Sequence, residues 1–295
     1  ATALLKRTKI SSTGGNYLST TSVFSEQVFF TPYGIDTAQV RNTLLMAGGF
    51  LKQYDGQSTI TEQGFHLYPE QPTYTTAAGS IPAGSYSYIV CWEWTDNYGQ
   101  VVRSNTSVPL TVTLGSSLQV TLTVQTLPIT ARLGSGSRTA PILAVYRTVN
   151  NGTTYYRVNQ LSTTWVYNNT SAQTITYVDN ALDSAINSNA LLYTTGGVFS
   201  NITLPNTNLM TVQKNRVIVA GTDNETNKVY YSKEKEEGIG VEFSNELSFV
   251  VDNLGGDITA LAAMDDKILI FKKSLVYFVS GTGSDKLGNG SFRDR

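Results

Sequence analysis

The segment from Ser85 to Trp94 constrains the fold of this chain more than any other. Its large side chains recur at every second position, as Tyr86, Tyr88, Val90, Trp92 and Trp94, and they alternate with Ser85, Ser87, Ile89, Cys91 and Glu93. Successive side chains of a β-strand point to opposite faces, so this period of two predicts a strand with one aromatic, strongly apolar face. Such a face needs a second layer of structure to cover it.

Similar strand-like runs fill the region from about residue 74 to 182. They lie at 85–94, 101–104, 108–114, 118–124, 142–149, 153–158 and 175–178. Asn151-Gly152 joins two of these runs in the clearest hairpin of the chain. Roughly seven short strands in about 100 residues are typical of an immunoglobulin-like or fibronectin-III-like β-sandwich. Cys91 is the only cysteine, which excludes an internal disulfide and favours a buried structural thiol.

The regions on either side predict a different β architecture. After residue 183, one order of elements occurs twice, at 209–232 and at 260–279. It consists of an apolar strand, a turn, a basic residue, a second apolar strand and a Val-Tyr-aromatic strand. A spacing of roughly 50 residues with several strands per copy is typical of propeller blades. The segment 44–54, which an Asp55-Gly56 turn follows, is interpreted as a more degenerate copy. Further strands are predicted at 23–30 and 63–68.

Two details of the repeat lead to specific expectations. The run Ile268 to Phe271 lacks alternation, which predicts a strand covered on both faces with Leu269 buried. The Gly-rich and Asp-rich segments 252–257 and 281–286 are expected to connect blades.

The predicted fold is therefore all-β: a β-propeller, incomplete in this chain, with an inserted β-sandwich. Residues 1–73 are the first part of the propeller, 74–182 the sandwich, and 183–295 the second part. The Pro-rich segment at 69–72 and the polar segment at 180–189 should hold the two ends of the insertion close together. At about 45 residues per blade, too few residues remain for a usual propeller. Either the chain is a fragment, as the missing initiator Met also allows, or the ring closes differently.

Charge gives little indication of a nucleic-acid or membrane partner. Charged residues make up 15% of the chain, and the net charge is −1. No strong overall field therefore attracts anions. The basic clusters at 6–9, 272–273 and 293–295 and the mixed run Lys233–Glu237 are predicted to be solvated surface. No run approaches the ~18 apolar residues of a membrane span.

The residue types argue against catalysis. His66 is the single histidine, which excludes a His-cluster metal site, and we expect it to be a half-buried structural residue. The Gly-rich segments at 134–138, 238–240 and 288–290 lack the pattern of a phosphate-binding loop. The acidic turns Asp223–Glu225 and Asp265–Asp266 lack the ligand alternation of a calcium loop.

A pair of carboxylates for glycoside cleavage is the one catalytic option that stays open. The available acids are Glu93, Asp96, Asp179, Asp257 and Asp265, and nothing in their spacing marks two of them as partners. We therefore predict that the chain is not an enzyme, with no catalytic, cofactor-binding or metal-binding residues and no cofactor.

Three segments together resemble a known family. They are Gly84–Val90 with Thr95–Gly99; Val145–Thr148 with Tyr155–Val158 and Tyr177–Asp179; and Asn215–Ser232 followed by Ile258–Gly281. In these segments the chain resembles the tail nozzle, or tail stabilisation (hub), proteins of short-tailed bacteriophages. The resemblance implies a propeller with an inserted sandwich, arranged as a homo-oligomeric ring, a hexamer, at the distal tail of the virion. It also implies contacts with tail adaptor or portal-side proteins and with tail fibres or spikes, with DNA only as passing cargo.

The leading hypothesis is therefore a structural component of a bacteriophage tail that acts by protein–protein assembly. The alternative is a tail module that binds host-surface glycans through aromatic side chains such as Trp92, Trp94 and Trp165. For these residues, a place in the sandwich core is the simpler interpretation. A glycan-cleaving tail enzyme is the second alternative.

Overall fold

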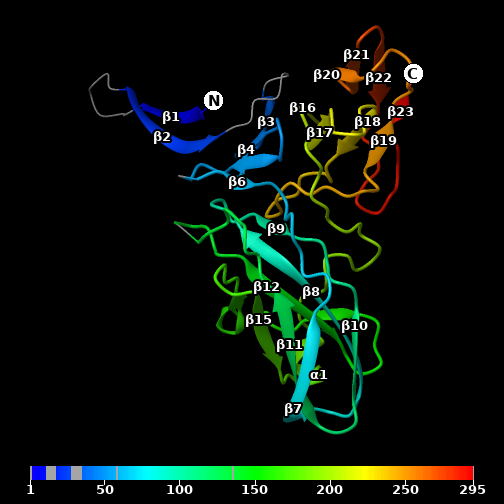
Figure 1. Ribbon diagram of the computed structural model, residues 1–295. Coiled ribbons are helices and arrows are strands. Elements are labelled where there is room, and N and C mark those ends of the chain that lie inside the picture. The colour runs from blue at the N-terminus through cyan, green and yellow to red at the C-terminus, as the bar shows by residue number, and fades with distance from the viewer. Residues whose placement is uncertain (1, 11–17, 28–34, 58, 135, 295) are drawn as a thin grey trace.

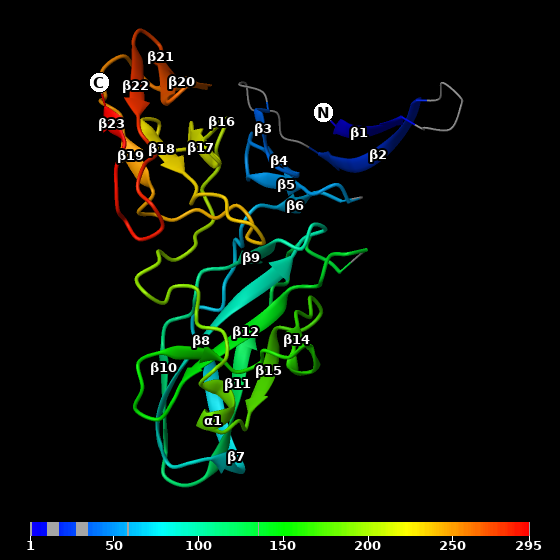
Figure 2. The ribbon, with the colours of Figure 1, turned by 180° about the vertical axis from the view of Figure 1, so that it is seen from behind.

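The computed structural model describes residues 2–10, 18–27, 35–57, 59–134 and 136–294. Antiparallel strands dominate it, and the helical elements among these residues are the single turn α1 (Asp183–Ile186) and the 3-10 turn Ser162–Thr164. The all-β prediction is confirmed. None of the described helices is long and apolar enough to cross a membrane. Figures 1 and 2 show two groups of sheets stacked end to end, with a hairpin projecting beside one group.

The projecting hairpin consists of β1 (Thr2–Ile10) and β2 (Leu18–Gln27). The predicted strand at 23–30 coincides with β2 up to Gln27, and Val28 to Phe30 lie outside the described residues. The basic cluster at 6–9 belongs to β1.

Three four-stranded antiparallel sheets, each with its strands in chain order, form one group. The first sheet contains β3 (Thr37–Val40), β4 (Thr43–Met46), β5 (Lys52–Tyr54) and β6 (Thr61–Glu62). The second contains β16 (Leu209–Gln213), β17 (Arg216–Ala220), β18 (Lys228–Tyr231) and β19 (Ser248–Val250). The third contains β20 (Ile258–Met264), β21 (Lys267–Lys272), β22 (Val276–Ser280) and β23 (Arg293–Asp294). The two copies predicted after residue 183 are thus two sheets of identical strand order.

The three sheets pack face to face through two cores. Leu45 of the first sheet shares a core with Val217 and Val219 of the second. Ile218, which lies between those two valines, shares the next core with Ile268 and Ile270 of the third sheet. Adjacent residues of a strand point to opposite faces, so β17 is buried on both sides. The first strands of the sheets lie together, because β16 contacts both β3 and β20.

The expectation that β21 would be covered on both faces is wrong. β21 is an inner strand of its sheet, and Ile268 and Ile270 are buried, but Leu269 and Phe271 on the other face are half-exposed. Among the described residues, no further sheet covers that face. The lack of alternation indicated an apolar strand, but it could not indicate whether a neighbouring sheet was present on each side.

Two other predictions in this group need correction. Residues 63–68 do not form a strand: β6 ends at Glu62, and Gly64 takes a positive φ of +70° that turns the chain out of the sheet. Residues 281–286 lie between β22 and β23 of one sheet and do not connect two sheets, whereas 252–257 do connect β19 to β20.

Two facing sheets form the second group. One contains β10 (Leu110–Leu114), β8 (Gly84–Thr95), β12 (Ile142–Thr148) and β13 (Tyr155–Arg157), with β9 (Val101–Arg103) and β14 (Val166–Tyr167) at its margins. The other contains β15 (Thr174–Asp179), β11 (Leu118–Gln125) and β7 (Thr73–Ile81). The aromatic face of β8 lies between them, as its alternation predicted, and shares one core with Val120, Leu122 and Val124 of β11. The sequence analysis did not predict β7, because all of its residues except Tyr74 and Ile81 are small or polar and most are exposed.

Candidate functional site

A polar junction connects the two-sheet group to the first four-stranded sheet. The guanidinium of Arg138 binds both carboxylate oxygens of Asp55, with Nε 2.9 Å from Oδ2, and Asn97 donates its backbone N–H to the same carboxylate at 2.9 Å. Arg132 donates to the carbonyl oxygens of Glu62 and Gly64, and its Nη1 lies 3.4 Å from the Glu62 carboxylate. Both arginines come from the loop between β11 and β12 and are buried.

Burial and charge oppose each other in these carboxylates. Burial alone would raise the pKa of Asp55, but hydrogen bonds and charge from Arg138, with backbone N–H donors, hold that pKa below its usual value. Burial would likewise raise the pKa of Glu62, and the charge of Arg132 with the hydrogen bond from Thr130 lowers it overall. The carboxylates of Asp55 and Glu62 therefore stay negatively charged at positions where burying a carboxylate without a cationic partner would destabilise the fold.

Two lysines that the sequence analysis placed on a solvated loop, Lys233 and Lys235, are buried in the structure. Lys233 is buried, and its ammonium donates to the carbonyl oxygen of Phe199 at 2.7 Å, to Asn201 Oδ1 at 2.6 Å and to Glu242 at 3.3 Å. Lys235 is also buried, with its ammonium on the carbonyl oxygen of Ile239. The expectation of a solvated run from Lys233 to Glu237 is therefore wrong for its two lysines. Oxygen atoms of Phe199, Asn201 and Glu242 bind the Lys233 ammonium, and nearby carbonyl oxygens bind that of Lys235.

The candidate acids of the two-sheet group are engaged in ion pairs or hydrogen bonds. Glu93 is paired with Arg157 at 2.7 Å and with Arg103 at 3.0 Å. Although burial would raise its pKa, the two guanidinium groups lower it. Asp179 is fully buried, accepts a hydrogen bond from Tyr88 at 2.8 Å and pairs with Arg147 at 2.8 Å. Arginine side chains therefore neutralise both carboxylates in the interior of the two-sheet group.

Asp96 differs from these acids, because its partners are backbone groups. Its Oδ1 accepts N–H groups of Tyr98 at 2.8 Å and Gln100 at 2.9 Å, as expected for an acidic residue that closes a turn. Burial raises its pKa above the usual value despite these hydrogen bonds.

The candidate acids in the four-stranded group, Asp257 and Asp265, lie on the surface. Asp257 and Asp265 are exposed, at the start and the end of β20. Asp223, Asn224 and Asp257 line one cavity of ≈ 450 Å³ together with Lys273, which lies 3.5 Å from the Asp257 carboxylate. Across the described residues, no cluster of three or more His, Cys, Asp or Glu side chains is suited to a metal ion.

His66, Cys91 and the tryptophans occupy very different environments. His66 lies outside any strand, so the expectation of a strand at this position is wrong; its ring and that of Phe50 meet edge to face, with centroids 4.7 Å apart. Cys91 is buried, as expected, and burial raises the pKa of its thiol. Trp92 and Trp94 are fully buried in the core. Trp165 is half-buried, and its ring centroid lies 6.4 Å from that of the exposed Tyr167.

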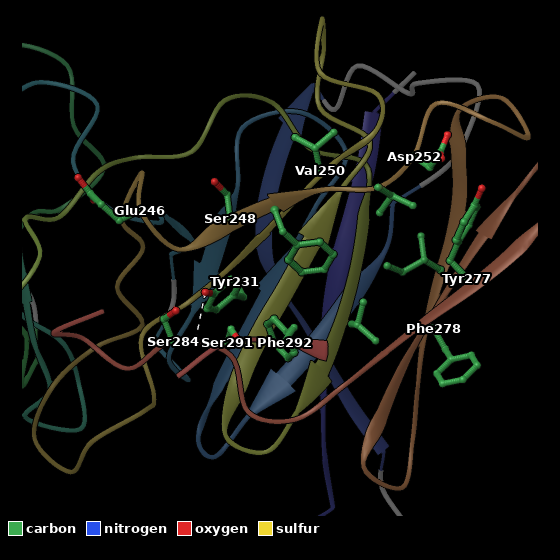
Figure 3. Close-up of a pocket in the computed structure, with 14 residues that line it drawn as sticks. Tyr231, Glu246, Ser248, Val250, Asp252, Tyr277, Phe278, Ser284, Ser291 and Phe292 are labelled. Atoms are coloured by element: carbon green, nitrogen blue, oxygen red, sulfur yellow. Dashed lines mark hydrogen bonds between the residues drawn. The ribbon is translucent and has the colours of Figure 1, made fainter. Parts of the chain in front are cut away.

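A groove of ≈ 560 Å³ lies between the outer strands of the second and third sheets. Figure 3 shows Tyr231 and Phe292 close together in it, with Ser248 and Val250 on β19 at one side and Tyr277 on β22 at another. The Tyr231 and Phe292 rings meet edge to face at 4.9 Å, and Phe249 lies 5.4 Å from Phe292. The backbone N–H of Ser284 donates to the Tyr231 hydroxyl at 3.2 Å. An aromatic floor with a hydroxyl-bearing rim suits an apolar side chain presented by another protein.

The edge of this groove is also available for β-pairing. β19 is an edge strand of its sheet, and Val250 is 69% exposed. An uncovered edge strand presents backbone donors and acceptors to any chain that lies alongside it. The groove and the edge together form a surface suited to a neighbouring protein.

Comparison with known proteins gives no further guide. No protein-family model matches this sequence, and no curated protein is significantly similar to it.

Proposed function

We propose that this protein is a structural subunit of a bacteriophage tail, in the nozzle ring through which DNA leaves, and that it acts by protein–protein assembly. One observation carries the proposal: three four-stranded sheets of identical strand order are interrupted, between the first and the second, by a unit of two facing sheets. That order matches what the nozzle family resemblance implies, a β-propeller with an inserted β-sandwich.

The surfaces of the molecule support an assembly role. The aromatic groove beside β19 and the exposed Val250 and Leu254, at 69% and 65%, provide apolar contact area near one edge. Two of the acids considered for glycoside cleavage, Glu93 and Asp179, are buried in ion pairs with arginines, and Asp96 accepts backbone N–H groups. In the proposed ring, residues 1–73 and 183–295 would form the propeller of each subunit. Residues 74–182 would form its sandwich.

The test is the position of the chain in purified particles. A gold-labelled antibody against residues 74–182, or density fitted in electron micrographs of intact tails, should place several copies around the tail axis at its distal end. Density away from the axis, at a fibre tip or in the capsid, would refute the proposal.

Because Trp92 and Trp94 are buried, the Trp165–Tyr167 pair is the one observation that supports a glycan-binding role. Exposed aromatic pairs can stack on sugar rings. A glycan array distinguishes the two roles: binding that is lost in Trp165→Ala would favour the glycan module over the assembly subunit.

A further inference from the structure

Three buried side chains with complementary chemistry meet at Lys233. The side-chain nitrogen Nζ of Lys233 lies 2.6 Å from Oδ1 of Asn201 and 3.3 Å from Oε2 of Glu242. The residues Lys233, Asn201 and Glu242 are 6%, 3% and 9% exposed. Because a carbonyl bond measures about 1.2 Å, Nζ lies within roughly 4 Å of Cγ, the amide carbon of Asn201. An amine, an amide and a carboxyl group are therefore within reach of one another and away from bulk water.

Backbone hydrogen bonds hold the three residues in this arrangement. Lys233 donates its backbone N–H to the carbonyl oxygen of Glu242 at 2.8 Å. The next residue, Phe243, accepts the backbone N–H of Ile202 at 2.9 Å. The segment that carries Glu242 is thus bonded both to Lys233 and to the residue that follows Asn201.

The amide of Asn201 has a defined orientation. Its Nδ2 donates to the carbonyl oxygen of Arg103 at 3.1 Å, while its Oδ1 accepts from Lys233. The Tyr193 hydroxyl accepts the backbone N–H of Asn201 at 3.1 Å, and the Tyr193 ring centroid lies 5.4 Å from Nζ of Lys233. The carbonyl of the amide therefore points to the amine, and its nitrogen is bonded elsewhere.

The surroundings of the Lys233 amine favour its neutral form. Burial lowers the pKa of Lys233, and the charges of Lys286 and Arg103 lower it further, although Glu242 raises it. A desolvated lysine with a lowered pKa is a nucleophile, because its nitrogen lone pair is free to form a bond.

Glu242 is placed to carry the proton that the amine loses. Its Oε2 already accepts a hydrogen bond from Lys233. Its other oxygen, Oε1, is buried and has no hydrogen-bond partner among the described residues. A buried carboxylate oxygen without a donor is costly, so taking up a proton relieves part of that cost.

We propose that Lys233 and Asn201 join in an intramolecular isopeptide bond, with Glu242 as the proton carrier. Glu242 takes one proton from the ammonium of Lys233. The lone pair of Nζ then forms a bond to Cγ of Asn201, and the bond from Cγ to Nδ2 breaks. Nδ2 leaves as ammonia after it receives the proton of Glu242, which takes a second proton from the amine. An amine and a primary amide thus become a secondary amide and ammonia, and no oxidant or other reactant is needed.

A cavity of ≈ 110 Å³ beside the three residues gives ammonia a way out. Lys233 and Glu242 line its buried part, and the exposed pair of Glu236 and Lys286 also lines it. The cavity therefore extends from the reacting groups to the surface.

The bond closes a covalent loop around three strands of the second sheet. Asn201 precedes β16, and Lys233 follows β18, so β16, β17 and β18 all lie within the loop. A cross-link that closes a loop stabilises a fold chiefly by restricting the unfolded chain. The inference goes beyond the proposed tail function and does not depend on it.

The first test is the mass of the intact 295-residue chain, measured under denaturing conditions. The isopeptide bond makes the chain lighter than its sequence by one ammonia molecule. Glu242→Gln lacks the proton carrier, and Lys233→Arg has a guanidinium that stays protonated, so both variants should have the full sequence mass. Lys235→Arg is the matched control and should still lose ammonia. Lys235 is also buried, but its ammonium binds the carbonyl oxygens of Glu236 and Ile239.

Trypsin digestion locates the bond. Cleavage after Lys and Arg should leave residues 158–214 joined to residues 229–235, because a modified Lys233 is not cleaved. The location is needed because an Asn followed by Gly can also expel ammonia, by closing a succinimide ring. The two Asn-Gly pairs of the chain begin at Asn151 and Asn289, and both lie in other tryptic peptides.

Three results would overturn the inference. They are a folded wild-type chain with its full sequence mass, an ammonia loss that maps outside the joined peptides, and a Glu242→Gln chain that loses ammonia as readily as wild type. Circular dichroism checks that each variant is folded. If Glu242→Gln does not fold, the comparison is made between Lys233→Arg and the Lys235→Arg control.

Discussion

Arg138 binds the carboxylate of Asp55 across 83 positions of sequence, with Nε 2.9 Å from Oδ2 and Nη2 on Oδ1. Both side chains are almost fully buried. The pair connects the loop between β11 and β12 to the end of β5, and so holds the two-sheet group on the first four-stranded sheet.

Breaking this pair should be costly. Arg138→Leu leaves Asp55 buried without its cation, and removing one partner of a buried pair typically costs about 3–5 kcal/mol. Urea unfolding measures the loss. Lys286→Leu, which breaks an exposed pair with Glu236, is the control and should change stability little. Equal effects of the two substitutions would show that the Arg138 pair is not a major stabilising contact.

Acid should destabilise the protein through its buried carboxylates. Burial would raise the pKa values of Asp55, Glu62 and Glu93, but their arginine partners lower them overall. A group with a lowered pKa in the folded state contributes stability above its unfolded pKa, near 4, and loses it as pH falls through the folded value. Melting temperatures measured from pH 7 to pH 3 should decrease once the pH is below about 4. Asp55→Asn should flatten that fall, and an unchanged slope would contradict the assignment.

Asp96 should behave in the opposite way. Burial raises its pKa, so its charged form is disfavoured in the folded state and stability is lost as pH rises through that pKa. Asp96→Asn keeps an oxygen to accept the N–H groups of Tyr98 and Gln100. The variant should be at least as stable as wild type at pH 7, with its advantage shrinking in acid. An advantage that grows on acidification would contradict this.

Ile218 and Leu269 test how much a covering sheet contributes. Ile218→Ala opens a cavity in the core between the second and third sheets and should cost about 2–5 kcal/mol. Leu269→Ala removes a half-exposed side chain at the third residue of β21, where β17 has Ile218, and should lower the stability clearly less. Denaturant unfolding of dilute protein makes the comparison. Similar losses would show that Leu269 is covered within the single chain.

The two-sheet group should fold as a separate fragment, as its sequence predicts. Arg147 pairs with Asp179 and Asp183, both at 2.8 Å, and donates to the carbonyl oxygen of Ala181 at 3.0 Å. A fragment of residues 73–189 should therefore melt cooperatively and at a higher temperature than residues 73–180, which lack Asp183. An unfolded 73–189 fragment would show that the group depends on the four-stranded sheets.

Local pattern in the sequence determined the strands and their faces. The alternation in β8 identified which side chains enter the core between the two facing sheets, because successive side chains of a strand point to opposite faces. The repeated order of apolar and basic residues located the second and third sheets, and the single cysteine, Cys91, is buried as its lack of a disulfide partner suggested.

Only the tertiary structure decided what lies against those faces. Ile218 and Leu269 have similar local sequence, yet one is buried and the other is half-exposed, because burial depends on whether a further sheet packs there. The partners of Arg132, Arg138 and Lys233 were equally hidden from the sequence, since charge pairing over long separations leaves no periodic signal. Period and spacing describe one strand and its neighbours, whereas coverage and ion pairing arise from segments that meet only after folding.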